Sequence, residues 1–204
     1  MSSGARVCGQ GAWGGLRWIL VGIVVLASRG GAAEEDVPRE FPYVCRGWTR
    51  DQGLPDDTVR AVLQAADGYV WVATRRGLAR FDGFRFTVFD PGNTPEMPSE
   101  DCRRLAEDKQ GRLWIGTDDG LLCFAAGRFE RYGKDEGLSN ACVTALWVGR
   151  SGQLWIGTEG GLYAISEGNL RACPEAGYST PITSVAEDAT GRLWMGGAEL
   201  GWFD

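Results

Sequence analysis

The strongest constraint in this sequence is a short phrase, Gly-x-x-Trp followed by small or aliphatic residues, which occurs four times. Successive tryptophans of the phrase are 43, 41 and 39 residues apart. A period of roughly 40 residues is typical of supersecondary units that stack and bury a face on the next unit. We interpret the repeated residues as scaffold, because a residue required in every unit for packing does not specify one ligand. These residues are Gly68, Trp71, Gly111, Trp114, Gly152, Trp155, Gly191 and Trp194.

Apolar residues recur at fixed offsets around each phrase and predict four short strands per unit. One apolar strand precedes the Gly, the Trp strand follows it, and two further strands are separated by glycine-containing turns. Four antiparallel strands per 40 residues indicate an all-β fold, a β-propeller of four-stranded blades. The predicted blades span about 58–89, 101–132, 142–173 and 182–204, the last being incomplete. Residues 41–49 repeat the fourth-strand pattern and predict an additional outer strand.

The number of blades leaves more than one architecture open. Four blades can close into a ring, but the fourth repeat has no predicted fourth strand. Unpaired blade faces and strand edges are an aggregation liability. We therefore expect residues 34–204 to be the amino-terminal part of a longer, partial propeller. A closed four-bladed ring and a non-functional gene fragment are the alternatives.

Residues 1–33 predict a secretory signal peptide. Arg6 and Arg17 give a basic start, an apolar run of ten residues spans 18–27, and small residues end at Ala33. An uncleaved membrane anchor is the alternative, but a span of the hydrocarbon core needs about 20 apolar residues. The expected location of the mature chain is therefore outside the cytoplasm.

Composition excludes several classes of function. The chain has no histidine, which removes a His general base, a His metal ligand and a phospho-accepting His. Residues 34–204 carry 18 basic and 27 acidic side chains, which argues against a nucleic-acid partner. Five cysteines follow Ala33 without metal-type spacing, and the pattern favours buried, unpaired thiols, Cys45 and Cys102 among them.

Functional residues are expected where the repeats differ, in the loops of one face. Two loop sets meet there in a propeller: those between the second and third strands, and those between blades. Their acids, arginines and aromatic residue could hydrogen-bond a polar ligand, although charged loop tips are often merely solvated. The candidate ligand-binding residues are Arg75, Arg76, Asp118, Asp119, Glu159 and Tyr178.

Asp108 and Asp188 precede their turn glycines by three residues, a spacing that suggests either calcium binding or turn capping. Gly149 and Ala65 stand at the same position in the other repeats, so turn capping is favoured. We predict no metal site, no cofactor and no catalytic residue.

Several segments together resemble the two-component regulator propeller repeat. They are Asp51-Gln-Gly-Leu-Pro55, Val59, Asp67-Gly-Tyr-Val-Trp-Val-Ala-Thr74, Arg76-Gly-Leu78 and Arg80-Phe-Asp-Gly-Phe-Arg-Phe86. The resemblance covers about residues 43–204. The fourth copy departs from it, since Gly197 replaces the motif Thr and one extra residue precedes Gly201.

The resemblance implies the periplasmic sensor region of a receptor that is anchored in the inner membrane. Its output domain would be a histidine kinase or a diguanylate cyclase, and this chain contains neither. The expected function is ligand sensing without enzymatic activity, with an oligosaccharide or another small polar ligand and a dimeric parent receptor. The alternative is a secreted propeller that binds carbohydrate or acts on polysaccharide. A propeller lyase of the antibiotic-inactivating type would be expected to use histidine.

Overall fold

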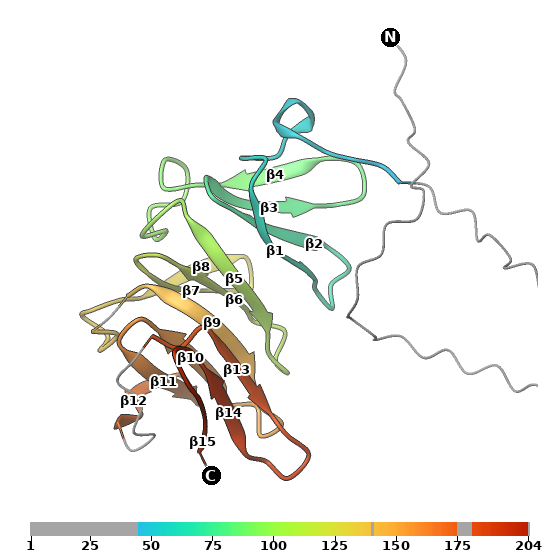
Figure 1. Ribbon diagram of the computed structural model, residues 1–204. Coiled ribbons are helices and arrows are strands. Elements are labelled where there is room, and N and C mark those ends of the chain that lie inside the picture. Colours follow the sequence, from blue (N-terminus) through green and yellow to red (C-terminus); the bar gives the residue numbers. More distant parts are fainter. Residues whose placement is uncertain (1–44, 140, 175–180, 204) are drawn as a thin grey trace, which may run out of the picture. The chain divides into compact units, whose positions relative to one another are not determined.

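The structure, a computed structural model, describes residues 45–139, 141–174 and 181–203. Within these residues it contains fifteen strands and one short 3-10 helix (Figure 1). The predicted signal segment 1–33 and Tyr178 lie outside the described residues. No helix in the described part is long and apolar enough to span a bilayer.

The strands form four antiparallel sheets in which each strand pairs with the next strand along the chain. The first sheet consists of β1 (Val59–Gln64), β2 (Val70–Thr74), β3 (Gly77–Phe81) and β4 (Phe86–Phe89). The second consists of β5 (Cys102–Glu107), β6 (Leu113–Thr117), β7 (Gly120–Ala125) and β8 (Arg128–Tyr132). The third consists of β9 (Val143–Val148), β10 (Leu154–Thr158), β11 (Gly161–Ser166) and β12 (Asn169–Ala172). The fourth has three strands, β13 (Ser184–Glu187), β14 (Leu193–Gly196) and β15 (Leu200–Phe203). The predicted all-β class with four-stranded antiparallel blades is confirmed.

Consecutive sheets pack on one another through their first strands, β1 on β5, β5 on β9 and β9 on β13. The repeated tryptophans contribute to these contacts. Trp71 is buried against Phe124 of the second sheet, with ring centroids 5.1 Å apart. Trp114 is fully buried in a cluster with Leu154 and Ile156 of the third sheet. Burying such a side chain stabilises the fold by roughly 1.5–3 kcal/mol, and the predicted packing of Trp between blades is confirmed at these positions.

The Thr that ends the repeated phrase closes the hairpin between the second and third strands of a blade. The Thr117 hydroxyl is buried, donates to the Gly120 carbonyl (2.9 Å) and accepts from the Asp119 amide (3.2 Å). The Thr74 and Thr158 hydroxyls donate in the same way to the carbonyls of Gly77 and Gly161. These bonds satisfy polar groups in a buried turn. Gly197 has no hydroxyl to offer in the fourth blade.

Asp108 and Asp188 hold their turns and also the repeated tryptophans. The Asp108 carboxylate accepts hydrogen bonds from the Arg112 amide (3.0 Å) and from the indole Nε1 of Trp114 (2.8 Å). Asp188 accepts in the same way from the indole of Trp194 (2.9 Å). Turn capping is therefore confirmed as the role of these carboxylates. Burial alone would raise the pKa of the Asp108 carboxyl, but the bonds from Trp114 and Arg112 outweigh it, and the pKa lies below its ordinary value.

The predicted outer strand at 41–49 is only partly described, and the described part is not a strand. Cys45 is an isolated bridge residue, and 46–49 form no regular element. Cys45 is exposed, so the expectation of a buried thiol there is wrong, whereas Cys102 is fully buried as expected. The reason is local: a short 3-10 helix, η1 (Arg50–Gln52), follows at once and is closed by a capping box between Thr49 and Gln52.

The segment that includes η1 covers one face of the first blade. Trp48 packs edge-on against Phe81, with centroids 5.2 Å apart. Leu54 is buried in a cluster with Val72 and Ala79. Leu138 follows Gly137 before the third blade just as Leu54 follows Gly53 before the first. Leu138 is fully buried in the cluster between the second and third blades. The segment before the first blade therefore acts as an interblade loop.

One apolar position of the first strand differs between the first blade and the others. Val185 of β13 is 8% exposed and packs in the cluster shared with the third sheet. Leu146 of β9 likewise packs on the cluster shared with the second sheet. The equivalent Val62 of β1 is 62% exposed. The first blade therefore presents, at Val62, an apolar contact that later blades bury against a neighbour.

We expect Trp114→Ala to lower the free energy of unfolding by about 3–5 kcal/mol, because it opens a cavity between two sheets. Chemical denaturation measures the change. Phe84→Ala is the matched control: Phe84 is 94% exposed, and its removal should change stability by no more than about 0.5 kcal/mol. Equal effects of the two substitutions would contradict burial of Trp114 between blades.

We expect Asp108→Asn to destabilise the protein by about 1.5–3 kcal/mol at neutral pH, because hydrogen bonds to a charged acceptor are weakened. The folded-state pKa of Asp108 is depressed, so its stabilisation is present above the ordinary Asp pKa. It is lost as the pH falls below about 4 through the folded-state value. Denaturation of both proteins between pH 7 and pH 2 tests this. A stability difference that does not shrink at low pH would contradict it.

Candidate ligand-binding face

The turns between second and third strands lie beside the segments that lead into the first strands. This follows from the register, in which Val59 pairs with Thr74, Cys102 with Thr117, and Val143 with Thr158. We call this end of the sheets the loop face. It contains the exposed predicted residues Arg75, Arg76, Asp118, Asp119 and Glu159. Their placement on one face agrees with the sequence analysis.

Arg76 is held by the segment before β1. Its Nε lies 3.9 Å from Oδ2 of Asp56. The other carboxylate oxygen, Oδ1, accepts from the Thr58 amide (2.8 Å). This backbone bond is the main cause of a lowered pKa of Asp56. Arg76 remains largely exposed, so its guanidinium is oriented but stays available to a ligand.

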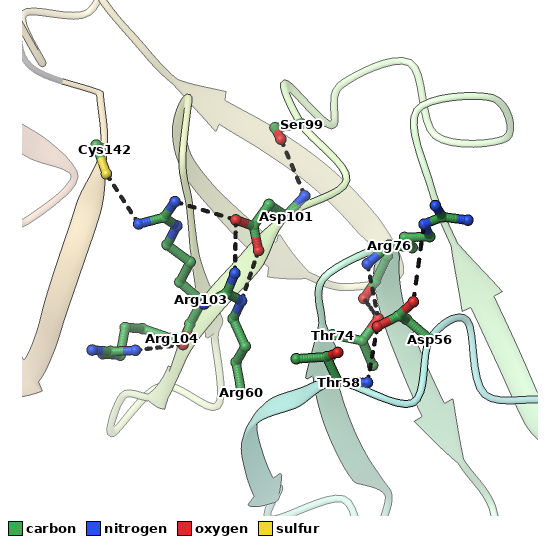
Figure 2. Close-up of polar contacts among 11 residues, drawn as sticks. Asp56, Thr58, Arg60, Thr74, Arg76, Ser99, Asp101, Arg103, Arg104 and Cys142 are labelled. Carbon is green, nitrogen blue, oxygen red and sulfur yellow. Dashed lines mark hydrogen bonds and ion pairs between the residues drawn. The ribbon is translucent and has the colours of Figure 1, made fainter. Parts of the chain in front are cut away.

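Arg60 and Arg103 share a single carboxylate across the first two blades. Arg60 Nε lies 2.8 Å from Asp101 Oδ1, and Arg60 Nη2 donates to Oδ2 (3.2 Å). Arg103 Nη2 reaches the same Oδ2 from the other side at 3.2 Å (Figure 2). The three side chains are 15–33% exposed. The pairing joins β1 to the start of β5 at the loop face.

The same network continues into the third blade through a thiol. Arg103 Nη1 donates to Sγ of Cys142 (3.4 Å), and Cys142 donates to Oε1 of Glu159 (3.4 Å). Burial, followed by the bond to Glu159, raises the pKa of the Cys142 thiol, so it stays protonated at neutral pH and acts as a donor. A continuous polar chain thus runs from Arg60 through Asp101, Arg103 and Cys142 to Glu159.

A polar cavity of about 380 Å³ lies beside Asp119, between that turn and the connection from β8 to β9. Within this β8–β9 loop, Oε2 of Glu136 accepts a hydrogen bond from the Gly133 amide (2.6 Å), which stabilises the loop conformation. The other charged residues that line the cavity are Arg131, Lys134 and Asp135. Of the predicted site residues, Asp119 is the one that lines this cavity.

The structure brings some predicted residues together and leaves others apart. Glu159 belongs to the polar chain, Arg76 pairs with Asp56, and Asp119 lines the cavity. Arg75 and Asp118 bond through their backbone amides to Thr58 and Asp101. Tyr178 lies outside the described residues.

Sequence reasoning missed the two arginines at the centre of the chain, Arg60 and Arg103, which both pair with Asp101. Their signal was present: Arg60 and Arg103 both stand eight residues before the hairpin Gly, where the later repeats have Thr. Both arginines lie in first strands, whereas the predicted site residues lie in loops.

Among the described residues, no group of three or more His, Cys, Asp or Glu side chains is arranged to hold a metal ion. The polar chain contains one side chain that could act as a nucleophile, the Cys142 thiol, and the pKa of this thiol is raised. Its thiol is protonated, and its arginines are paired with carboxylates. The arrangement is suited to binding by hydrogen bonds and charge.

A family model described as "Two component regulator propeller" matches residues 53–76 and 96–119. Each match runs from the interblade loop through the hairpin to the phrase that ends in Thr74 or Thr117. The chain carries two-component regulator propeller repeats.

Solved structures with these repeats' architecture include extracellular domains of hybrid two-component systems. One is that of BT3049 from B. thetaiotaomicron, with a TM-score of 0.70 and 20% identity over 79% of this chain and 24% of that one. Another is that of BT4673 from the same organism, with a TM-score of 0.60 and 20% identity over 78% of this chain and 23% of that one. At these identities the likeness shows the propeller fold. The chain spans about a quarter of the length of these structures.

A lyase shares the fold as well. Virginiamycin B lyase from Staphylococcus aureus superposes with a TM-score of 0.58 and 14% identity over 74% of this chain and 57% of that one. No curated protein matches the chain. The comparisons therefore show the repeat over residues 53–76 and 96–119 and the propeller fold of the chain.

We expect iodoacetamide to modify Cys142 of the native protein well before Cys102. Cys102 is fully buried, and burial followed by the charge of Asp101 raises the pKa of its thiol to about 12. Cys142 is partly exposed. Peptide mass spectrometry after timed alkylation measures both sites, and alkylation in concentrated guanidinium chloride is the control. Equal native rates would contradict the described burial.

Proposed function

We propose that this chain belongs to the extracellular sensor region of a two-component-type receptor, and that its loop face binds a small polar ligand such as an oligosaccharide. The observation that carries the proposal is the polar chain from Arg60 to Glu159. It joins three blades on the face where the repeats differ in sequence. The repeat family and the similarity to extracellular domains of hybrid two-component systems support the sensor role.

A face shared by several blades suits a sensor for a physical reason. A ligand that contacts residues of three blades gains affinity from their relative placement and in turn favours that placement. A change in the relative placement of the blades would thereby signal to the rest of a receptor that the ligand is bound. Export to the periplasm, an inner-membrane anchor and a dimeric parent receptor are part of this proposal.

The second candidate is a secreted propeller that binds carbohydrate or acts on it, and the shared fold of virginiamycin B lyase favours it. A structure of that lyase described as catalytically inactive carries a histidine-to-alanine replacement. This chain contains no histidine. An eliminating enzyme built here would need a different base. We therefore favour binding over catalysis.

A thermal-shift panel of neutral mono- and oligosaccharides and small polar metabolites tests the binding role. A ligand at 100 times its Kd stabilises the protein by about 2.7 kcal/mol, which corresponds to a rise in Tm of about 5–10 °C for a domain of this size. We expect Arg76→Gln and Glu159→Gln to reduce the shift.

Arg128→Gln is the matched control, because Arg128 is exposed at the start of β8, at the opposite end of its blade. Conversion of a panel compound into product would favour the enzyme alternative. If Arg76→Gln and Glu159→Gln leave the Tm shift unchanged, the ligand binds somewhere other than the loop face, and this part of the proposal is wrong.

A further inference from the structure

The arginines at the centre of the loop face occupy one special backbone position of the repeat. The pairing of the first and second strands skips one residue in each of three blades: between Val59 and Ala61, between Cys102 and Arg104, and opposite Gly157 and Thr158. The skipped residues are Arg60, Arg103 and Thr144. A β-bulge of this kind re-aims the side chain of the extra residue out of the regular alternation of the strand.

In the third and fourth blades the residue at this position is a threonine that bonds to the backbone. The Thr144 hydroxyl donates to the Gly157 carbonyl (3.1 Å) and also to the Ile182 carbonyl. Thr183, at the same repeat position of the fourth blade, donates to the Gly196 carbonyl (3.1 Å). A threonine at this position therefore satisfies backbone acceptors. Arginine is not required by the fold there.

In the first two blades the residue at this position is an arginine, and it pairs with a carboxylate instead of the backbone. Both reach outward to Asp101, which holds their guanidinium groups beside each other at the loop face (Figure 2). Arg104 follows on the same strand, and its Nη1 donates to the Arg103 carbonyl (2.9 Å). Two guanidinium groups from adjacent first strands thus share the Asp101 carboxylate, and the Arg104 guanidinium is close enough to both for their charges to act on it.

The positive charge of this cluster exceeds its negative charge, because Arg60, Arg103 and the neighbouring Arg104 accompany one carboxylate, Asp101. Arg103 Nε is buried and has no hydrogen-bond acceptor among the residues that the structure describes. Asp101 Oδ1 is likewise buried and is paired with Arg60 by charge without hydrogen-bond geometry. Burial, then the charges of Arg103 and Arg60, lower the pKa of Arg104. An oxyanion from outside would reach the partly exposed guanidinium ends of Arg60 and Arg103 and offset the excess positive charge.

We propose that Arg60, Arg103 and Arg104 form a binding site for an oxyanion, the carboxylate or sulfate group of a ligand that docks on the loop face. Asp101 positions the two bulge arginines. A planar guanidinium offers paired N–H donors that match the oxygen spacing of carboxylate and sulfate. The inference rests on the proposed function and deepens it, because it assigns an acidic group to the polar ligand.

Isothermal titration of the full chain with glucuronate, inorganic sulfate and neutral glucose tests the proposal, at an ionic strength held constant with sodium chloride. The variants are Arg60→Thr and Arg103→Thr, which install the residue that the fold accepts at the bulge of the third blade. Arg128→Thr removes the same charge at the other end of a blade. Circular dichroism and thermal unfolding check that each variant is folded.

We expect the wild type to bind glucuronate, and each bulge variant to bind it roughly tenfold more weakly or worse, because a charge-assisted bond is lost. Arg128→Thr should bind as the wild type does. Binding of both glucuronate and sulfate would show a general oxyanion site, and binding of glucuronate alone would show that the sugar ring contributes. Either result supports the proposal.

The proposal is overturned if the wild type binds neither anion, or if Arg60→Thr and Arg103→Thr bind as tightly as the wild type. An equal loss in Arg128→Thr also overturns it, because the effect would then be one of net charge. If a neutral saccharide instead binds in a manner that depends on Glu159, the proposed function stands and the oxyanion inference alone fails.

Discussion

The packing of large aromatic side chains between neighbouring blades, complete at Trp71 and Trp114 and partial at Trp155, is the constraint on which the structure depends. A small four-stranded sheet cannot bury both of its faces by itself, so each blade needs a neighbour. Trp71 and Trp114 meet that need, because each lies between its own sheet and the next. The residues around them serve this packing: Asp108 fixes the indole of Trp114, and Thr117 closes the hairpin behind it.

Because this scaffold is repeated, deviations from the repeat carry information about function. The bulge at the start of the first strand is the clearest case. In the third blade it holds a threonine whose hydroxyl satisfies the backbone, and in the first two blades it holds Arg60 and Arg103. The fold provides a bulge position in each of the first three blades, and two blades use it for charge. A sensor can change its ligand by altering such positions, since the packing does not depend on them.

Most of the fold was readable from the sequence, and the site was readable only in part. The blades and the buried tryptophans followed from the repeat, because packing demands the same residue types in every unit. The capping role of Asp108 followed from its position three residues before a turn glycine. The loop face followed from topology. Its central arginines were missed, because a strand position looks structural until its register is known. The conformation before the first blade was also missed, since the capping box of Thr49 overrides the strand-like spacing of Cys45 and Trp48.

The sequence by itself determined the repeat, its four-stranded unit and the family to which its phrase belongs. Periodic packing leaves a periodic signal, and that signal needs no coordinates to be read. Only the tertiary structure decided that Asp101 pairs with both Arg60 and Arg103, and that Cys142 links them to Glu159. These partners come from three blades, and the two pairs that cross between blades, Arg60 with Asp101 and Arg103 with Cys142, are 41 and 39 residues apart along the chain. Side chains so distant meet because sheet register and interblade packing bring them together, and no local pattern records that meeting.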